Sequence, residues 1–313
     1  MKIAITGAAG NLGSLLSEAF LKEDVTLNLL YHKKPINSNL LSSNNVTAFQ
    51  VDLAKPETLA SSLKDVDAVV HFAGVLFKGN PQKFLPITNT QYFKNLLNIA
   101  EECKVKRIVL FSFPHTEGET TPDHPATGRL DVNPISVHAK TRHEEEVLLM
   151  QKQDRFRCII ARCGMIYGKD IIMMDACKWF SKHWIMGIWK KPTWIHLISK
   201  EDFCSALKQT VLNPEANGIY HIGDDGKQTL QEFVDEACRY WGTRKPWRMP
   251  DWMVYTAAWF MEQWSLITGS KSPLTRDFVK IGHVSYYGDT SRMKTDLLPN
   301  LKYPTFKDGI ETM

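Results

Sequence analysis

Short apolar runs alternate with amphipathic stretches through the first half of the chain. Each run is brief and is bounded by turn-forming or charged residues, as expected for buried strands. The predicted strands lie at residues 3–6, 25–31, 46–51, 67–72, 107–112 and 156–161.

The stretches between these runs carry helical periodicity. Five apolar residues after the first strand share one helix face: Leu12, Leu15, Leu16, Ala19 and Phe20. Further helices are predicted at 56–63, 88–103 and 136–150. Strands alternating with helices are typical of a parallel sheet with crossover helices, so we expect an α/β, doubly wound Rossmann fold.

The regular alternation of strand-like and helix-like segments ends after residue 162. All nine tryptophans lie between Trp179 and Trp264, and strand-like pieces return at 195–198 and 218–222. We therefore predict a Rossmann core at 1–162. A smaller, Trp-rich and mainly substrate-binding lobe is predicted at 163–313. Because segments near 195–223 are expected to return to the core, the two regions are interleaved.

Composition narrows the classes of partner. The chain has 313 residues, 43% hydrophobic and 23% charged, which is ordinary for a soluble globular protein. The net charge is +4, and no run of Lys or Arg concentrates it. We therefore expect no nucleic-acid partner.

Cysteine usage and the N-terminus indicate a compartment. The six cysteines form no C-x-x-C pair, and no His lies at zinc-like spacing from them, so we expect reduced thiols and no metal. The first predicted strand follows Met1 directly, so no signal peptide is expected. The longest apolar run, 252–261, is too short to span a bilayer. These features favour a cytoplasmic protein.

The segment T-G-A-A-G-N-L-G at residues 6–13 follows a strand and opens a helix. Gly7 suits a tight turn, Gly10 lets the backbone approach a pyrophosphate, and Gly13 lets the helix pack closely on the strand. The free N–H groups of the helix N-terminus attract phosphates. We predict a dinucleotide site in this turn, formed also by Ala9, Asn11 and Leu12.

The end of the second strand bears on the choice between NAD and NADP. An acidic residue there would accept a hydrogen bond from the ribose 2′-OH. This chain instead has Tyr31-His32-Lys33-Lys34. Basic groups suit a 2′-phosphate, so we favour NADP over NAD, with His32 and Lys33 as contacts. The alternative is that these lysines are solvated loop residues.

Together with the glycine turn, several later motifs are similar to the extended short-chain dehydrogenase/reductase family, also called the NAD-dependent epimerase/dehydratase family. The resemblance covers nearly the whole chain and implies a Rossmann fold and an NAD(P) cofactor. The matching segments are Asp52-Leu53 beside adenine, Phe72-Ala73-Gly74 along the cofactor, Asn89, the R-C-G-M-I-Y-G stretch 162–168 with Cys163 near the nicotinamide, Asp202, and the strand 218–223.

The chain departs from the family at the catalytic residues. Family enzymes usually carry Y-x-x-x-K on the helix predicted at 136–150. Lys140 fits this motif, but Ser136 stands where the family has Tyr. A serine hydroxyl is a poor acid near neutral pH. The family's active-site Ser or Thr after the fifth strand aligns with Pro114, which leaves Ser112 and Thr116 as substitutes.

Three functions remain open on the sequence alone. In the first, which we favour, the protein is an enzyme, an atypical NAD(P)H-dependent reductase that transfers hydride to a hydrophobic, planar or conjugated small molecule. Lys140 then holds the ribose, and His115 is a candidate proton donor, although a surface-loop histidine is the plainer interpretation. In the second, the protein binds NAD(P) without turnover, like NmrA-type regulators. In the third, it is an epimerase or dehydratase, as the family name implies.

The tryptophans leave two further alternatives. Trp179, Trp184, Trp189 and Trp194 recur every five residues, which places them on no single helix face and argues against a membrane stripe. The segment 252–260 resembles a wide helical apolar band. We expect either core packing or an aromatic-lined substrate pocket there, and membrane-surface attachment of this lobe is the least favoured alternative. The family resemblance allows a homodimer.

Overall fold

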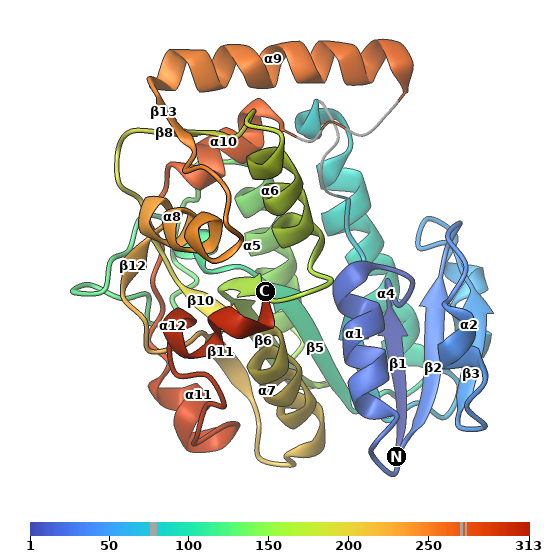
Figure 1. Cartoon of the computed structure of the whole chain (residues 1–313). Coiled ribbons are helices and arrows are strands. Elements are labelled where there is room, and N and C mark those ends of the chain that lie inside the picture. Colours follow the sequence, from blue (N-terminus) through green and yellow to red (C-terminus); the bar gives the residue numbers. More distant parts are fainter. Residues whose placement is uncertain (76–79, 270–271, 273) are drawn as a thin grey trace.

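A computed structural model describes residues 1–75, 80–269, 272 and 274–313 of the chain. Its centre is a seven-stranded sheet in which every neighbouring pair is parallel, in the order β11-β6-β5-β4-β1-β2-β3 (Figure 1). The strands are β1 (Lys2–Thr6), β2 (Thr26–Tyr31), β3 (Val46–Gln50), β4 (Ala68–His71), β5 (Arg107–Ser112), β6 (Arg157–Cys163) and β11 (Gly218–Ile222).

Helices cover both faces of this sheet, because alternate residues of a buried strand point to opposite sides. Ile3 and Ile5 of β1 pack in one cluster with the helices α1 (Asn11–Phe20) and α7 (Lys200–Leu212). Ala4 packs in the opposite cluster with residues of α4 and α5. The helices on that second face are α3 (Ala60–Leu63), α4 (Tyr92–Glu102) and α5 (Val137–Met150).

The strand order reverses at β1, which lies between β2 and β4. In open α/β sheets, ligands bind beyond the carboxyl ends of the strands at such a reversal. The register pairs Thr6 with both Leu30 and His71, so the carboxyl ends of β1, β2 and β4 lie at one edge. This arrangement confirms the doubly wound Rossmann fold that the sequence predicts.

The rest of the chain forms a smaller region beside the sheet. It contains three two-stranded sheets: β7 (Met165–Tyr167) with β10 (Leu197–Ser199), β9 (Trp194–Ile195) with β12 (Gln228–Thr229), and β8 (Gly187–Trp189) with β13 (Trp247–Met249). The helices of this region are α6 (Ile172–Lys182), α8 (Leu230–Tyr240), α9 (Asp251–Thr268), α10 (Arg276–Gly282), α11 (Ser291–Asp296) and α12 (Phe306–Gly309). The short helix α2 (Ser38–Leu41) packs beside β3 of the main sheet.

Two predicted segments differ in detail from the structure. The stretch 218–222 joins the main sheet as β11, whereas 195–198 divides between β9 and β10, which pair outside that sheet. The helix predicted from residue 88 starts as a π-helical segment, Pro86–Gln91, which continues directly into α4. The division of the chain at residue 162 stays a prediction.

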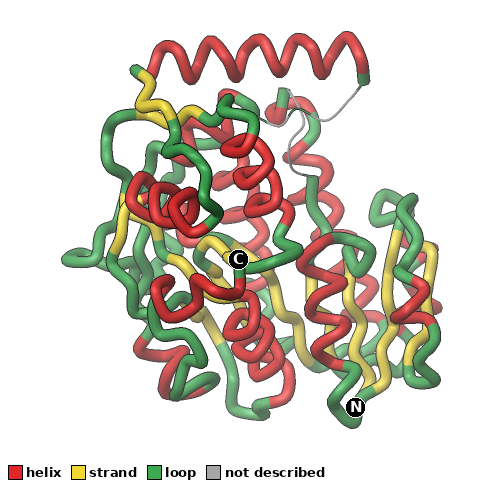
Figure 2. Tube along the Cα trace, viewed as in Figure 1, coloured by secondary structure: helices red, strands yellow, loops and turns green. Residues whose placement is uncertain are grey.

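The long helix α9 crosses one end of the molecule, apart from the sheet (Figures 1 and 2). Within the described part of the chain, no helix combines the length and apolar character needed to cross a membrane.

Candidate cofactor and active site

The glycine turn joins β1 to α1 at the reversal of strand order. Gly7 adopts a φ of +69°, and a Cβ there would lie 2.9 Å from the backbone nitrogen of Ala73. A Cβ on Gly13 would overlap the carbonyl oxygen of Gly7. Both positions therefore require glycine for geometric reasons that are independent of any ligand.

The first turn of α1 has the features of an anion site. Gly10 occupies the N-cap, with no side-chain cap hydrogen bond and no acidic residue in the first turn. The first N–H groups of a helix lack intrahelical partners and carry partial positive charge. A pyrophosphate placed here would satisfy them, so the turn and its uncapped helix fit a dinucleotide cofactor.

The other predicted cofactor residues lie at the neighbouring strand ends. His32 and Lys33 are exposed after β2, and Nε2 of His32 lies 3.8 Å from a carboxylate oxygen of Asp52, after β3. Leu53 follows Asp52, and its carbonyl accepts a hydrogen bond from Asn95. The segment Phe72–Gly74 leaves β4 beside Gly7. The fold thus gathers segments up to 67 residues apart, as the contact between Thr6 and Ala73 shows.

Thr6 fixes this edge between β1 and β4. The backbone nitrogen of Ala73 donates to Thr6 Oγ1 over 3.3 Å, and Thr6 Oγ1 lies 2.8 Å from Nδ1 of His71. Burial, aided by the charge of Arg142, lowers the pKa of His71 to about 3. The imidazole is therefore neutral at physiological pH, and its Nδ1 can accept the threonine proton.

Asn11 links the glycine turn to the smaller region. Its Nδ2 donates to the carbonyl of Asp170 over 2.7 Å, and its Oδ1 accepts from the nitrogen of Ile172 over 3.1 Å. The side chain thus holds the start of α6, which leaves the backbone of Asn11 as the part that can face a phosphate.

Ser136 and Lys140 lie one turn apart at the start of α5. Ser136 is the N-cap, and its Oγ accepts a hydrogen bond from the nitrogen of Ala139 over 3.0 Å. This explains why the helix begins at Val137, one residue after the predicted start. Lys140 is exposed.

His115 and Ser136 line the same small cavity. The cavity measures about 10 Å³ and is otherwise lined by Gly118, Ile135, Ala139, Ile281 and Val284. The ring of His115 lies 4.1 Å from that of Tyr286, and burial lowers its pKa to about 3. A neutral imidazole weighs against His115 as an acid, so its role as proton donor stays a prediction.

Ser112 is fully buried and engaged with a charge cluster. Its Oγ donates to Oε1 of Glu146 over 2.5 Å, and Thr116 lies 3.4 Å from the same oxygen. Arg162, with no exposed surface, donates to Glu146 and to Glu117 over 2.6 and 2.5 Å. These contacts give both hydroxyls a structural position between α5 and β6.

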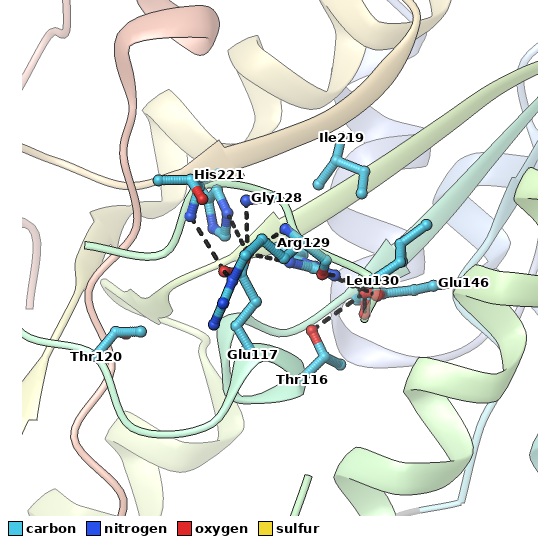
Figure 3. Close-up of polar contacts among 12 residues, drawn as sticks. Thr116, Glu117, Thr120, Gly128, Arg129, Leu130, Glu146, Ile219 and His221 are labelled. Atoms are coloured by element: carbon cyan, nitrogen blue, oxygen red, sulfur yellow. Dashed lines mark hydrogen bonds and ion pairs between the residues drawn. The ribbon is translucent and has the colours of Figure 1, made fainter. Parts of the chain in front are cut away.

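Figure 3 shows how Glu117 completes this cluster. Its carboxylate accepts from the backbone nitrogens of Gly128 and Arg129 over 2.6 and 3.0 Å and lies 3.3 Å from Nε2 of His221. Burial raises the pKa of Glu117, but the contacts with His221 and Arg162 outweigh it and lower the pKa to about 2. The carboxylate therefore stays charged in the folded protein.

The family model described as NAD dependent epimerase/dehydratase family matches residues 3–186, which is more than half of the chain. The chain belongs to this family. Its relatives are NAD-dependent enzymes, which confirms the sequence-based resemblance and the expectation of an enzyme. No curated protein matches the chain.

Three solved structures show how far the fold is shared. The dTDP-glucose 4,6-dehydratase of Bacillus anthracis, in complex with NAD, is 17% identical over 100% of this chain and 94% of its own, with a TM-score of 0.76. The UDP-glucose 4-epimerase of Thermotoga maritima, with UDP-glucose, is 15% identical over 100% and 97%, with a TM-score of 0.76. The UDP-glucuronic acid 4-epimerase of Bacillus cereus, with its substrate and NAD, is 16% identical over 100% and 97%, with a TM-score of 0.75.

The structure also contains buried charged side chains that the sequence analysis missed. Arg142 of α5 pairs with Glu145 over 2.7 Å, and a Cβ on Gly74 would overlap the Arg142 guanidinium. Asn89 donates to Thr141 over 3.1 Å. The signal for this polar layer was the spacing of His138, Arg142 and Glu145, four and three residues apart on one helix face. Apolar patterning does not reveal such a face.

Cys163 ends β6 with its thiol buried, and burial raises the pKa of this thiol well above its ordinary value. The thiol is therefore protonated and unreactive. Its contact with a nicotinamide stays a prediction.

Proposed function

We propose that the protein is an NADP-preferring oxidoreductase that reduces a small apolar, conjugated substrate without a tyrosine acid. The observation that carries the cofactor part is the uncapped N-terminus of α1 at the edge shared by β1, β2 and β4. When bound there, the nicotinamide dinucleotide supplies hydride. The backbone of residues 7–13 would hold its pyrophosphate, and Asp52 and Leu53 its adenine end.

Reduction is favoured over epimerisation because of what replaces the tyrosine. Epimerases and dehydratases need an acid and base that exchange a proton with the substrate. Here Ser136 occupies the position, is buried, and already caps α5. Reduction of a conjugated bond needs only one proton, which water can deliver. Lys140, one turn later and exposed, would hold the ribose.

The lining of the cavity beside Ser136 supports an apolar substrate. Ile135, Ala139, Ile281 and Val284 contribute its apolar surface. A volume of about 10 Å³ is close to the minimum needed for one water molecule. The cavity must therefore widen before a substrate can enter.

The preference for NADP rests on His32 and Lys33, both exposed at the end of β2. We expect NADPH to bind more tightly than NADH in a titration followed by cofactor and tryptophan fluorescence. The Lys33→Ala substitution should weaken NADPH about tenfold, the loss of one charge-assisted contact, and leave NADH within about twofold.

Lys64→Ala is the matched control for this titration. Lys64 is also exposed, but it lies near the amino end of β1, where its backbone carbonyl accepts a hydrogen bond from the side chain of Lys2. The Lys64→Ala substitution should leave the affinities for NADPH and NADH unchanged. Equal loss of NADPH and NADH in Lys33→Ala would contradict the proposed 2′-phosphate contact.

The near-closed cavity favours a second candidate, binding of NAD(P) without turnover. Screening with enones, imines and heteroaromatic compounds separates the two, with Lys140→Ala as the control for catalysis. Oxidation of NADPH that depends on Lys140 supports the reductase. Tight cofactor binding with no oxidation of NADPH by any of these classes supports a sensor. The six unpaired cysteines support a reducing compartment such as the cytoplasm for either function.

A further inference from the structure

Helix α9 presents its apolar residues outward. Four residues on its inner side are buried: Val254, Ala258, Glu262 and Ser265. Seven large apolar residues are exposed: Trp252, Met253, Trp259, Phe260, Trp264, Leu266 and Ile267. A helix turns about 100° per residue, which places these two sets on opposite sides. The usual polarity of a surface helix is thus reversed.

The inner side is anchored by specific contacts, so this orientation is fixed. Oε2 of Glu262 lies 2.8 Å from Nε of Arg276 in α10, and Oε1 accepts from the Arg276 backbone over 2.7 Å. Tyr255 stacks on His283, with ring centroids 6.0 Å apart. Rotating the helix to bury its tryptophans would break the ion pair between Glu262 and Arg276. It would also expose the buried side chains on the inner side of α9.

The exposed side combines bulk with an absence of charge. Trp252, Trp264 and Ile267 are 68%, 67% and 82% exposed. Helix α9 contains no Lys or Arg, and its two acidic residues are Asp251 at the N-terminus and the buried Glu262. An exposed apolar patch of this kind marks an interaction site. Tryptophan and phenylalanine are the side chains that settle at the boundary between lipid headgroups and acyl chains.

A cationic pocket adjoins the start of α9. It measures about 260 Å³ and is lined by Arg244, Lys245, Trp184 and Trp247, together with Ser181, Met186 and Pro246. Trp247 begins β13, which leads through Pro250 into α9 at the same end of the molecule (Figure 1).

This pocket carries more positive charge than its carboxylate partner neutralises. The Arg244 guanidinium lies 3.7 Å over the ring of Trp184, and within the described ranges no carboxylate forms an ion pair with it. Lys190 and Lys191 are exposed in the loop that follows β8. Lys245 shares Asp235 with Arg248. Positive charge beside exposed tryptophan complements the phosphates of anionic lipids.

We propose that the outer side of α9 and the Arg244–Lys245 pocket bind the surface of a membrane that contains anionic phospholipid. Helix α9 lies in the plane of the interface, with its tryptophans at the depth of the headgroups, and does not cross the bilayer. On the sequence alone, membrane-surface attachment is the least favoured alternative; the orientation of α9 makes it the favoured one. It is independent of the reaction proposed above.

A second copy of the chain is the competing occupant. Pairing of two α9 helices would cover the apolar residues but would leave the cationic pocket without a counterpart. Lipid accounts for both features at once, which is why we favour it.

The test is co-sedimentation of the full-length protein with vesicles. We expect binding to phosphatidylcholine mixed with phosphatidylserine, with a blue shift of tryptophan emission, and weaker binding to phosphatidylcholine alone. The triple variant Trp259→Gln, Phe260→Gln, Trp264→Gln should lose at least about tenfold in partitioning, since three large side chains no longer enter the interface. Arg244→Gln with Lys245→Gln should reduce binding to the anionic vesicles only.

Controls separate surface binding from misfolding. Leu41→Gln changes an apolar residue that is 47% exposed on α2, which lies beside the edge strand β3 and away from α9 (Figure 1), and this variant should bind vesicles like the unchanged protein. The triple variant should keep its cofactor affinity and helical circular dichroism. Equal sedimentation of the triple variant and the unchanged protein would overturn the proposal. Failure of the unchanged protein to bind either kind of vesicle would also overturn it. If the unchanged protein is then a dimer and the triple variant a monomer, the outer side of α9 is a dimer interface.

Discussion

At the scale of single residues, the cofactor turn is constrained by backbone contacts. Gly7 needs its positive φ, and Gly13 touches the Gly7 carbonyl too closely for any side chain. Because Thr6 ties the turn to His71 and Ala73, the turn cannot shift to admit a larger residue without disturbing the end of β4.

We therefore expect Gly13→Ala to weaken binding of NAD(P)H at least about tenfold and to lower the free energy of unfolding by about 1–3 kcal/mol, the range seen for overpacked sites. Cofactor fluorescence and urea unfolding measure the two effects. Ser14→Ala is the matched control, since it removes only a hydroxyl that bonds locally to Asn11. Unchanged cofactor affinity in Gly13→Ala would contradict the turn as the phosphate site.

The sequence predicted these glycines because strand, turn and helix signals agreed at one place. It could not predict the state of Ser112 or His115. Whether a hydroxyl faces a substrate or a buried carboxylate depends on Glu146, which is 34 residues away and approaches only when α5 packs on the sheet. The same holds for Gly74 and Arg142. Tertiary contacts of this kind leave no local pattern.

At the scale of elements, a buried charge cluster joins α5 to β6. Arg162 of β6 donates twice to Glu146 of α5, through Nε over 3.0 Å and Nη2 over 2.6 Å. Neither side chain has exposed surface. Removing one partner leaves the other charge buried and uncompensated, which is costly.

Glu146→Ala should accordingly lower the free energy of unfolding by about 3 kcal/mol, the lower end of the usual range, because Glu117 still faces Arg162. Glu144→Ala provides the control. Glu144 is exposed two residues earlier, accepts a bond from Thr90, and should cost less than about 1 kcal/mol. Equal costs for the two variants in denaturant titrations would show that the cluster adds nothing to stability.

The order of strands and helices followed well from sequence, since β1, β4 and β5 contain short apolar runs that are separated by helical periodicity. The smaller region did not. Its strands are two or three residues long, and whether a short apolar piece such as 195–198 joins the main sheet depends on neighbours that the pattern does not specify. In α9 the periodicity predicted a helix, but it could not show which side faces solvent.

At the scale of the whole molecule, buried titratable groups set the response to acid. Burial lowers the pKa of His71, His115 and His138 to about 3 and that of His196 to about 4, so these side chains take up protons at lower pH in the folded protein than in the unfolded chain, where the ordinary value is 6.5. Burial raises the pKa of Glu145 to about 7 and that of Asp224 to about 8, which acts in the opposite sense above pH 4.5.

The balance of these groups predicts a change of slope. Between about pH 6.5 and 4.5, four histidines against two carboxyls leave about two extra protons on the unfolded chain, so the free energy of unfolding falls by about 2.7 kcal/mol for each pH unit of acidification. Below about pH 4.5 the unfolded carboxyls protonate too, and the contribution of Glu117 is also lost. The slope should then become about twofold steeper.

Urea titrations from pH 8 to pH 3.5 measure this profile. His124→Gln, which changes an exposed histidine, should leave it unaltered. A constant free energy of unfolding from pH 6.5 to pH 4 would show that the buried imidazoles do not remain neutral.

The bonds from Asn11 to Asp170 and Ile172 have a further consequence. They fasten the cofactor turn to the beginning of α6. The other end of α6 contains Ser181, which lines the cationic pocket together with Trp184. An 11-residue helix is a stiff rod of about 16 Å. If binding of the dinucleotide displaces this rod, thermodynamic reciprocity requires that lipid alter the affinity for the dinucleotide by the same factor. Occupancy of the dinucleotide site would then set how tightly the protein binds a bilayer.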